Sequence, residues 1–124
     1  MRGIKVAAVL AIFLVSVAVL LNAGQNKFGV ADQQKTTFSH AIRVGDTVLP
    51  QGEYKIQHTM EGAEHVMVFT QLKASNPATA RAKCQLVSVE KKIEQTYFGY
   101  QKSAASEYLL QEMAFKGDTA KHVF

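Results

Sequence analysis

Two histidines and two methionines lie close together in the chain, and their side chains are the kind that bind metals or small ligands. His58 and Met60 precede the segment Glu61-Gly62-Ala63-Glu64, and His65 and Met67 follow it. Imidazole and thioether groups both suit Cu(I), but two histidines at this spacing are no established metal motif. Methionine is also a common filler of hydrophobic cores. The cluster is therefore either a copper site or the partly wet end of a core.

The element that carries this cluster is predicted to be a β-hairpin. Residues 53–60 and 65–72 alternate in polarity, which is typical of strands, and Gly62 suits the tight turn between them. A turn centred on Gly62-Ala63 pairs Met60 with His65, His58 with Met67, Ile56 with Phe69 and Tyr54 with Gln71, all on one face. The Tyr54 hydroxyl adds a hydrogen-bonding group to that face. The candidate ligand-binding residues are Tyr54, His58, Met60, His65 and Met67.

The motifs of the common catalytic classes are absent from the sequence. It has no Gly-x-Ser-x-Gly, no His-Glu-x-x-His, no phosphate-binding glycine loop and no Cys-x-x-Cys. Ser39 and His40 are neighbours on a predicted strand, so their side chains lie on opposite faces and cannot act as a nucleophile and its base. We expect a protein that is not an enzyme and that needs no cofactor.

The N-terminus has the layout of a secretory signal peptide over residues 1–23. A basic start, Met1 to Lys5, precedes an apolar run from Val6 to Leu21 and then small residues. The run is shorter than the roughly 20 residues of a membrane-spanning helix, so no span is expected after cleavage. Cleavage is expected after Ala23, with Ala31 as the alternative. The protein is then secreted or periplasmic, unless an uncleaved N-terminal helix anchors it.

Charge and cysteine content narrow the function further. The chain has 14 basic and 10 acidic residues, and loss of Arg2 and Lys5 with the signal lowers the net charge from +4 to +2. The basic residues are scattered, so no nucleic-acid partner is expected. Cys84 is the single cysteine, which rules out an internal disulfide. Alternation places Cys84 on the same side as Ala82 and Leu86, as a buried apolar residue.

The remaining pattern predicts one all-β domain over residues 36–124, after a flexible leader at 24–35. Short alternating segments are separated by Gly, Asp, Asn or Pro, with no convincing amphipathic helix. The expected strands are 36–44, 53–60, 65–72, 81–91, 94–102, 107–115 and 119–124. About six or seven short strands at this spacing favour a small antiparallel sandwich or barrel.

The segment Leu49-Pro50-Gln51-Gly52-Glu53-Tyr54 is explained by backbone geometry. Pro50 suits a type I turn, Gly52 reconnects the turn to a strand, and Tyr54 then enters the core. The segment resembles the LPAGEY-type segment of a group of small secreted bacterial β-proteins, with Gln51 at a position where that group has a small residue. The resemblance implies an exported β-fold and no reaction.

Two functions fit these observations. The first is an exported, non-catalytic β-domain of the bacterial cell envelope, with a structural role or an unknown protein partner. The alternative is a protein that binds a small ligand or copper on the hairpin face between Tyr54 and Met67. A cavity of several hundred Å³ would favour the alternative.

Overall fold

The computed structural model describes residues 27–124, and these residues form nine strands and no helix. The expected signal peptide, residues 1–23, and the cleavage position after Ala23 lie outside the described residues. No helix in the described part of the chain has the length and apolar character needed to cross a membrane. The strands are β1 (Gln33–Phe38), β2 (Ile42–Val44), β3 (Thr47–Leu49), β4 (Gly52–Glu61), β5 (Glu64–Gln71), β6 (Thr79–Ser88), β7 (Tyr97–Lys102), β8 (Tyr108–Ala114) and β9 (Ala120–Val123).

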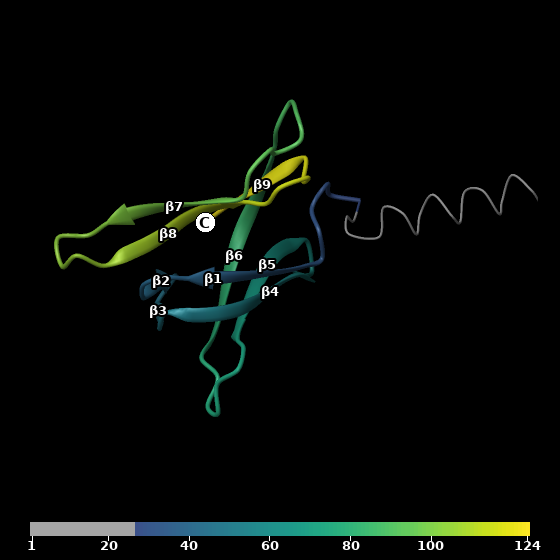
Figure 1. The fold of residues 1–124 in the computed structure, drawn as a ribbon. Coiled ribbons are helices and arrows are strands. Elements are labelled where there is room, and N and C mark those ends of the chain that lie inside the picture. The colour runs from purple at the N-terminus through teal and green to yellow at the C-terminus, as the bar shows by residue number, and fades with distance from the viewer. Residues whose placement is uncertain (1–26) are drawn as a thin grey trace, which may run out of the picture.

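All nine strands belong to one mixed sheet that is not closed. Its order is β1-β4-β5-β6-β9-β8-β2-β3, and β7 pairs with β8. In Figure 1, β1, β4 and β5 lie in one layer and β7, β8 and β9 in another, while β6 crosses between the two. The first part of β6, residues 79–84, pairs with β5, and the last part, residues 85–88, pairs with β9. One long strand therefore joins the two layers.

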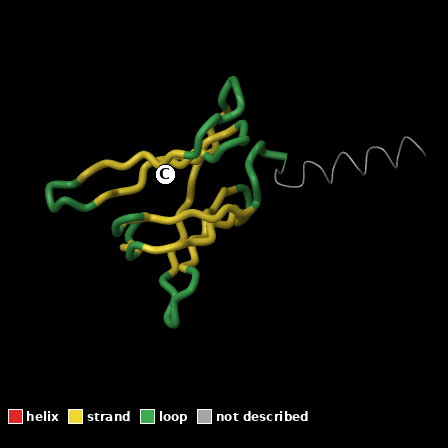
Figure 2. Tube along the Cα trace, in the orientation of Figure 1, coloured by secondary structure: helices red, strands yellow, loops and turns green. Residues whose placement is uncertain are grey.

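The all-β prediction is confirmed, whereas a purely antiparallel sheet is wrong. Arg43 on β2 pairs with Leu109 on β8 in parallel. The expected strand 36–44 is also broken into β1 and β2 by bends at Ser39 and His40 (Figure 2). Because the chain turns there, β2 leaves the neighbourhood of β4 and pairs with β3 and β8 instead.

The first strand begins inside the segment that was expected to be a flexible leader, residues 24–35. β1 starts at Gln33, and the Val30 side chain is completely buried. Residues 27–32 belong to no strand, and backbone hydrogen bonds connect them to His58 and Thr119. We call residues 27–32 the N-terminal strap.

The predicted register of the central hairpin is confirmed. Tyr54 pairs with Gln71, His58 with Met67 and Met60 with His65. Gly62 occupies the turn with φ of +61°, a conformation that glycine adopts without a steric penalty. The hairpin face that carries the candidate residues is therefore the one that the sequence predicted.

The core lies between the two layers. Tyr54, Ile56 and Phe69 come from β4 and β5, and Leu110 and Met113 come from β8. Cys84 is 8% exposed and Ala82 and Leu86 pack against the same core, which confirms the predicted alternation of β6. Phe69 and Phe124 approach each other with ring centroids 6.2 Å apart.

Candidate functional site

Tyr54 belongs to the scaffold of the hairpin. Its side chain is fully buried and its hydroxyl donates a 2.7 Å hydrogen bond to the carbonyl oxygen of Pro50. The expectation that this hydroxyl would be offered to a ligand is therefore corrected, because the turn four residues upstream already uses it. Burial also raises the pKa of the Tyr54 hydroxyl, so it stays protonated.

His58 and His65 are brought into direct contact. His58 Nε2 lies 2.8 Å from His65 Nδ1, so one ring donates its N–H and the other accepts. The Phe28 ring of the strap meets the His65 ring edge-on, with centroids 4.7 Å apart, and lies 5.6 Å from the His58 ring. Burial and the neighbouring His65 lower the pKa of His58, and Asp32 partly opposes them.

The two methionines separate. Met67 is 2% exposed and packs in the core, while Met60 is 41% exposed near the hairpin tip. The register of β4 and β5 places both methionines on one face of the hairpin. Met60 lies closer to the exposed hairpin tip, whereas Met67 lies over the core. The five candidate residues therefore do not form one site: only His58 and His65 meet through polar atoms.

A second pair of side chains, Cys84 and His122, lies next to the His58–His65 pair on β6 and β9. Cys84 pairs with His65 across β5 and β6, and its Sγ lies 3.8 Å from Nδ1 of His122. Sequence analysis did not select His122, although it alternates with Ala120 on the last strand. A lone histidine on a four-residue strand carries too little signal, and only the pairing of β9 with β6 brings it to Cys84.

Burial keeps this second pair neutral. Desolvation raises the pKa of the Cys84 thiol to about 11. It also lowers the pKa of His122 to about 4, helped by the nearby His58 and His65. A nucleophilic cysteine needs its thiolate form, and at pH 7 this pair holds a thiol beside an uncharged imidazole. The geometry thus favours a packing role for the pair.

Metal-binding geometry is also missing from this cluster. Across residues 27–124, no group of three or more His, Cys, Asp or Glu side chains is placed to hold a metal ion. One ring nitrogen of His58 faces one ring nitrogen of His65 at 2.8 Å, while Met60 is 41% exposed and Met67 is buried. Copper binding by the methionines together with a histidine therefore stays a prediction.

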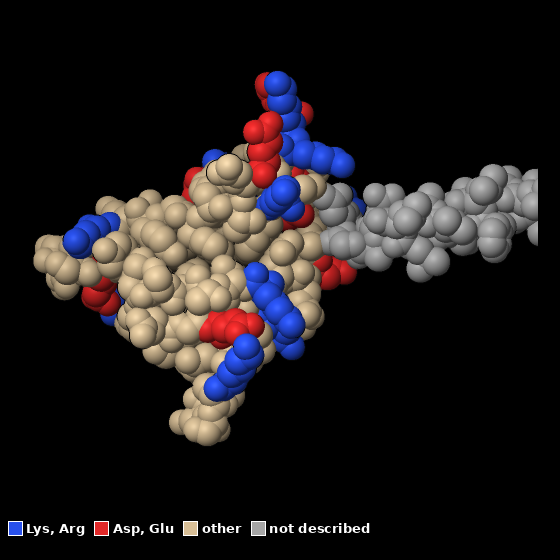
Figure 3. All heavy atoms as spheres, viewed as in Figure 1, with Lys and Arg blue, Asp and Glu red and all other residues tan. Residues whose placement is uncertain are grey.

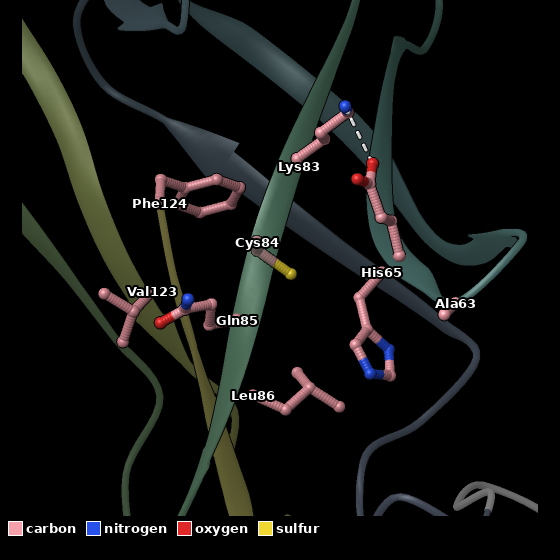
Figure 4. Close-up of a pocket in the computed structure, with 9 residues that line it drawn as sticks. Ala63, His65, Lys83, Cys84, Gln85, Leu86, Val123 and Phe124 are labelled. Carbon is pink, nitrogen blue, oxygen red and sulfur yellow. Dashed lines mark ion pairs between the residues drawn. The ribbon is translucent and has the colours of Figure 1, made fainter.

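An open pocket of about 790 Å³ surrounds the point where β6 leaves β5 and joins β9. Figure 4 shows Cys84 at its centre, with His65 on one side and Val123 and Phe124 on the other. Its lining is Ala63, Glu64, His65, Lys83, Cys84, Gln85, Leu86, Val123 and Phe124.

The rim of this pocket carries one ion pair. Lys83 Nζ lies 2.7 Å from a carboxylate oxygen of Glu64, and this hydrogen bond raises the pKa of Lys83. Elsewhere on the face drawn in Figure 3, acidic and basic side chains are interspersed, with no continuous patch of one sign. The pocket therefore combines an apolar wall with a charged rim.

A smaller hollow of about 290 Å³ lies at the other end of the molecule, between the β1–β2 loop and β8. His40 stacks on Tyr108 there, with ring centroids 4.0 Å apart, and Arg43 forms an ion pair with Glu107. Because Phe38 pairs with Gly52 and Gln33 with Gln57, His40 and His58 lie at opposite ends of the β1–β4 pair, and His40 can serve as a comparison residue.

Comparison with known proteins returns no relative: no protein-family model, no curated protein and no solved structure matches this chain.

Proposed function

We propose that this chain is an exported, non-catalytic domain of the bacterial cell envelope that binds a small amphipathic organic ligand in the pocket around β6. The observation that carries the proposal is the pocket itself, which at about 790 Å³ falls within the range of small-molecule sites. Between the two functions that fit the sequence, an open pocket of this size supports ligand binding rather than a purely structural role.

The lining indicates the chemistry of the ligand. Leu86, Val123 and Phe124 offer apolar surface, and His65 and Gln85 offer hydrogen bonds at its edge. The Glu64–Lys83 ion pair at the rim would orient a polar or charged end toward solvent. A flat or branched apolar body with one polar end suits such a surface.

We infer export from the N-terminal sequence pattern. The contacts of the strap help to choose between the two candidate cleavage positions. Cleavage after Ala31 would remove Val30, a completely buried side chain, together with Phe28. Cleavage after Ala23 would retain both. We therefore place the mature N-terminus at Gly24, in a secreted or periplasmic protein. The resemblance of the Leu49–Tyr54 segment to that of small secreted β-proteins agrees with this location.

Two further inferences come from the core: a non-catalytic role and a sandwich architecture. The neutral Cys84–His122 pair supports a non-catalytic role, because it holds no activated nucleophile. Two layers that meet across Phe69 and Phe124, in a sheet that is not closed, support a sandwich rather than a barrel.

A matched pair of substitutions on β6 tests the proposal. Leu86→Trp places an indole in the pocket, whereas Val87→Trp adds the same group to the next residue, which is 41% exposed and lies outside the lining. The dye ANS, an apolar body with one sulfonate, serves as the probe. We expect ANS fluorescence to rise with the native protein and with Val87→Trp, and the rise to be lost in Leu86→Trp.

Native mass spectrometry of the protein recovered from its own host supplies the second measurement. A copurifying small molecule that is present in Val87→Trp and absent in Leu86→Trp supports the proposal. A bare mass together with equal ANS response in both variants overturns it, and a copurifying protein would support the structural or protein-partner role instead.

A further inference from the structure

The N-terminal strap holds the two layers of the molecule together at one end. The strap's Asp32 carbonyl accepts a 2.8 Å hydrogen bond from the backbone N–H of His58 on β4. Its Gly29 carbonyl accepts a second one, also 2.8 Å, from the backbone N–H of Thr119 beside β9. Between these two bonds the Val30 side chain is fully buried. The strap is therefore a distinct docked element with contacts to both layers.

The side chain that anchors the strap on the hairpin is Phe28, and its partners are the paired imidazoles. Phe28 meets His65 edge-on at 4.7 Å and lies at a tilt to His58 at 5.6 Å. The position of the Phe28 ring thus depends on both imidazoles staying side by side. That arrangement in turn depends on the 2.8 Å hydrogen bond between them.

This hydrogen bond is sensitive to proton number. With both rings neutral, one N–H points at one lone pair. A single added proton keeps a donor facing an acceptor and makes the bond charge-assisted. A second proton removes the acceptor and sets two positive rings in contact, so the rings must separate.

The groups packed around the pair carry charges of both signs, and Lys27 of the strap lies over the Phe28 ring, 5.2 Å from its centroid. Asp32 on the strap is the acidic residue that favours the charged form of His58. On the other sides lie neutral Cys84 of β6 and His122 of β9, whose own protonation would add positive charge. On the neighbouring strands, Glu64 of β5 and Lys83 of β6 form an ion pair, so their opposite charges largely offset each other.

We propose that the His58–His65 pair is an acid-sensitive latch, which holds the N-terminal strap against the hairpin at neutral pH and releases it when both imidazoles are protonated. The latch shares His65 with the lining of the proposed ligand site, but it requires no ligand. Because burial and the neighbouring His65 lower the pKa of His58, the release is expected below the ordinary histidine value near 6.5.

A tryptophan at position 28 would report by its fluorescence whether the strap is docked, because the native chain contains no tryptophan. Phe28→Trp is made in the full chain and purified after export. Because Phe28 is half-buried, the emission of this variant at pH 7 is expected at a shorter wavelength than that of a fully exposed indole. As pH falls from 7 to 5 the emission maximum is expected to move to longer wavelength, while the far-UV circular dichroism of the sheet stays constant.

Substitutions in this background separate the latch from general acid effects. His65→Gln keeps a neutral hydrogen-bonding group at the pair, so its emission is expected not to change with pH. His40→Gln, at the other end of the molecule, is expected to keep the full shift. His58→Gln repeats the first test at the other ring, in case one variant folds poorly.

Gly29→Ala tests the docking itself at neutral pH. Gly29 has φ of +81°, and a β-carbon there would collide with the Thr119 hydroxyl, so this variant is expected to show long-wavelength emission at every pH. Gly45→Ala also carries positive φ but meets nothing within 4 Å, and is expected to behave like the parent. The latch is overturned if the shift survives in both glutamine variants, if it follows the loss of circular dichroism, or if emission does not change down to pH 5.

Discussion

The Tyr54 hydroxyl donates a 2.7 Å hydrogen bond to the carbonyl oxygen of Pro50, four residues upstream. This bond explains the four-residue spacing between the turn-forming Pro50 and the aromatic Tyr54. The ring fills the core between the layers, while its hydroxyl fixes the turn that leads into β4. The segment is structural, and its polar atom is not offered to a ligand.

Removing this hydroxyl is expected to destabilise the fold without disturbing the core. Tyr54→Phe leaves the Pro50 carbonyl without that donor, and a lost hydrogen bond of this kind costs about 1 kcal/mol. Urea unfolding measures the loss. Tyr97→Phe is the control, because Tyr97 is 43% exposed, and we expect almost no change there. An equal loss in both variants would contradict the role of the Tyr54–Pro50 bond.

Gly52 is expected to be more sensitive to substitution than Gly45. Gly52 has φ of +145°, and an added β-carbon would lie 3.1 Å from Nε2 of Gln71. That side chain is held in place, because its Oε1 accepts a hydrogen bond from the Ala78 N–H. Gly52→Ala should therefore lower the free energy of unfolding by about 1–3 kcal/mol.

Gly45→Ala provides the comparison for this strain. Gly45 has φ of +58° and open space around it, so the substitution should cost about 1 kcal/mol. Thermal unfolding of both variants shows which substitution causes the larger loss of stability. A smaller loss at Gly52 than at Gly45 would show that the turn before β4 can relax.

Stability is expected to fall in acid through His122. Its pKa is lowered to about 4 in the folded protein, below the ordinary value near 6.5. The unfolded chain therefore takes up a proton first as pH falls, and the stabilisation is complete above about pH 6.5 and lost toward pH 4. This residue alone should cost about 3 kcal/mol between pH 7 and pH 4.

Urea titrations at several pH values test this prediction. His122→Leu should unfold more easily at pH 7 but lose less stability on acidification than the native chain. The pH dependence that remains should come partly from His58, whose pKa is also lowered. An unchanged slope in His122→Leu would contradict burial of a neutral imidazole at this position.

Cys84 is expected to react slowly in the folded protein. With a thiol pKa raised to about 11 from 9.0, the thiolate population at pH 8 is roughly a hundredfold smaller than in the unfolded chain. Alkylation by iodoacetamide, followed by mass spectrometry with and without urea, measures the ratio. Because this is the single cysteine, every adduct reports on it. Similar rates in both conditions would contradict its burial.

The periodicity of the sequence predicted most of the strands and the pairing of the central hairpin. Those features depend on neighbouring residues, since alternation fixes which face each side chain takes, and a glycine turn fixes the register. The same argument correctly placed Cys84 on the core side of β6. It missed β3, because three residues are too few for alternation to be recognised, and it placed the start of the ordered chain too late.

By itself, the sequence determined an all-β chain, the face of the hairpin that carries His58 and His65, and a scaffold role for Pro50 and Gly52. Only the tertiary structure decided what those histidines meet. Phe28 reaches them from before the first strand, and His122 reaches Cys84 from the last strand. Contacts between such distant segments depend on how β6 passes from one layer to the other, and local periodicity carries no record of that path.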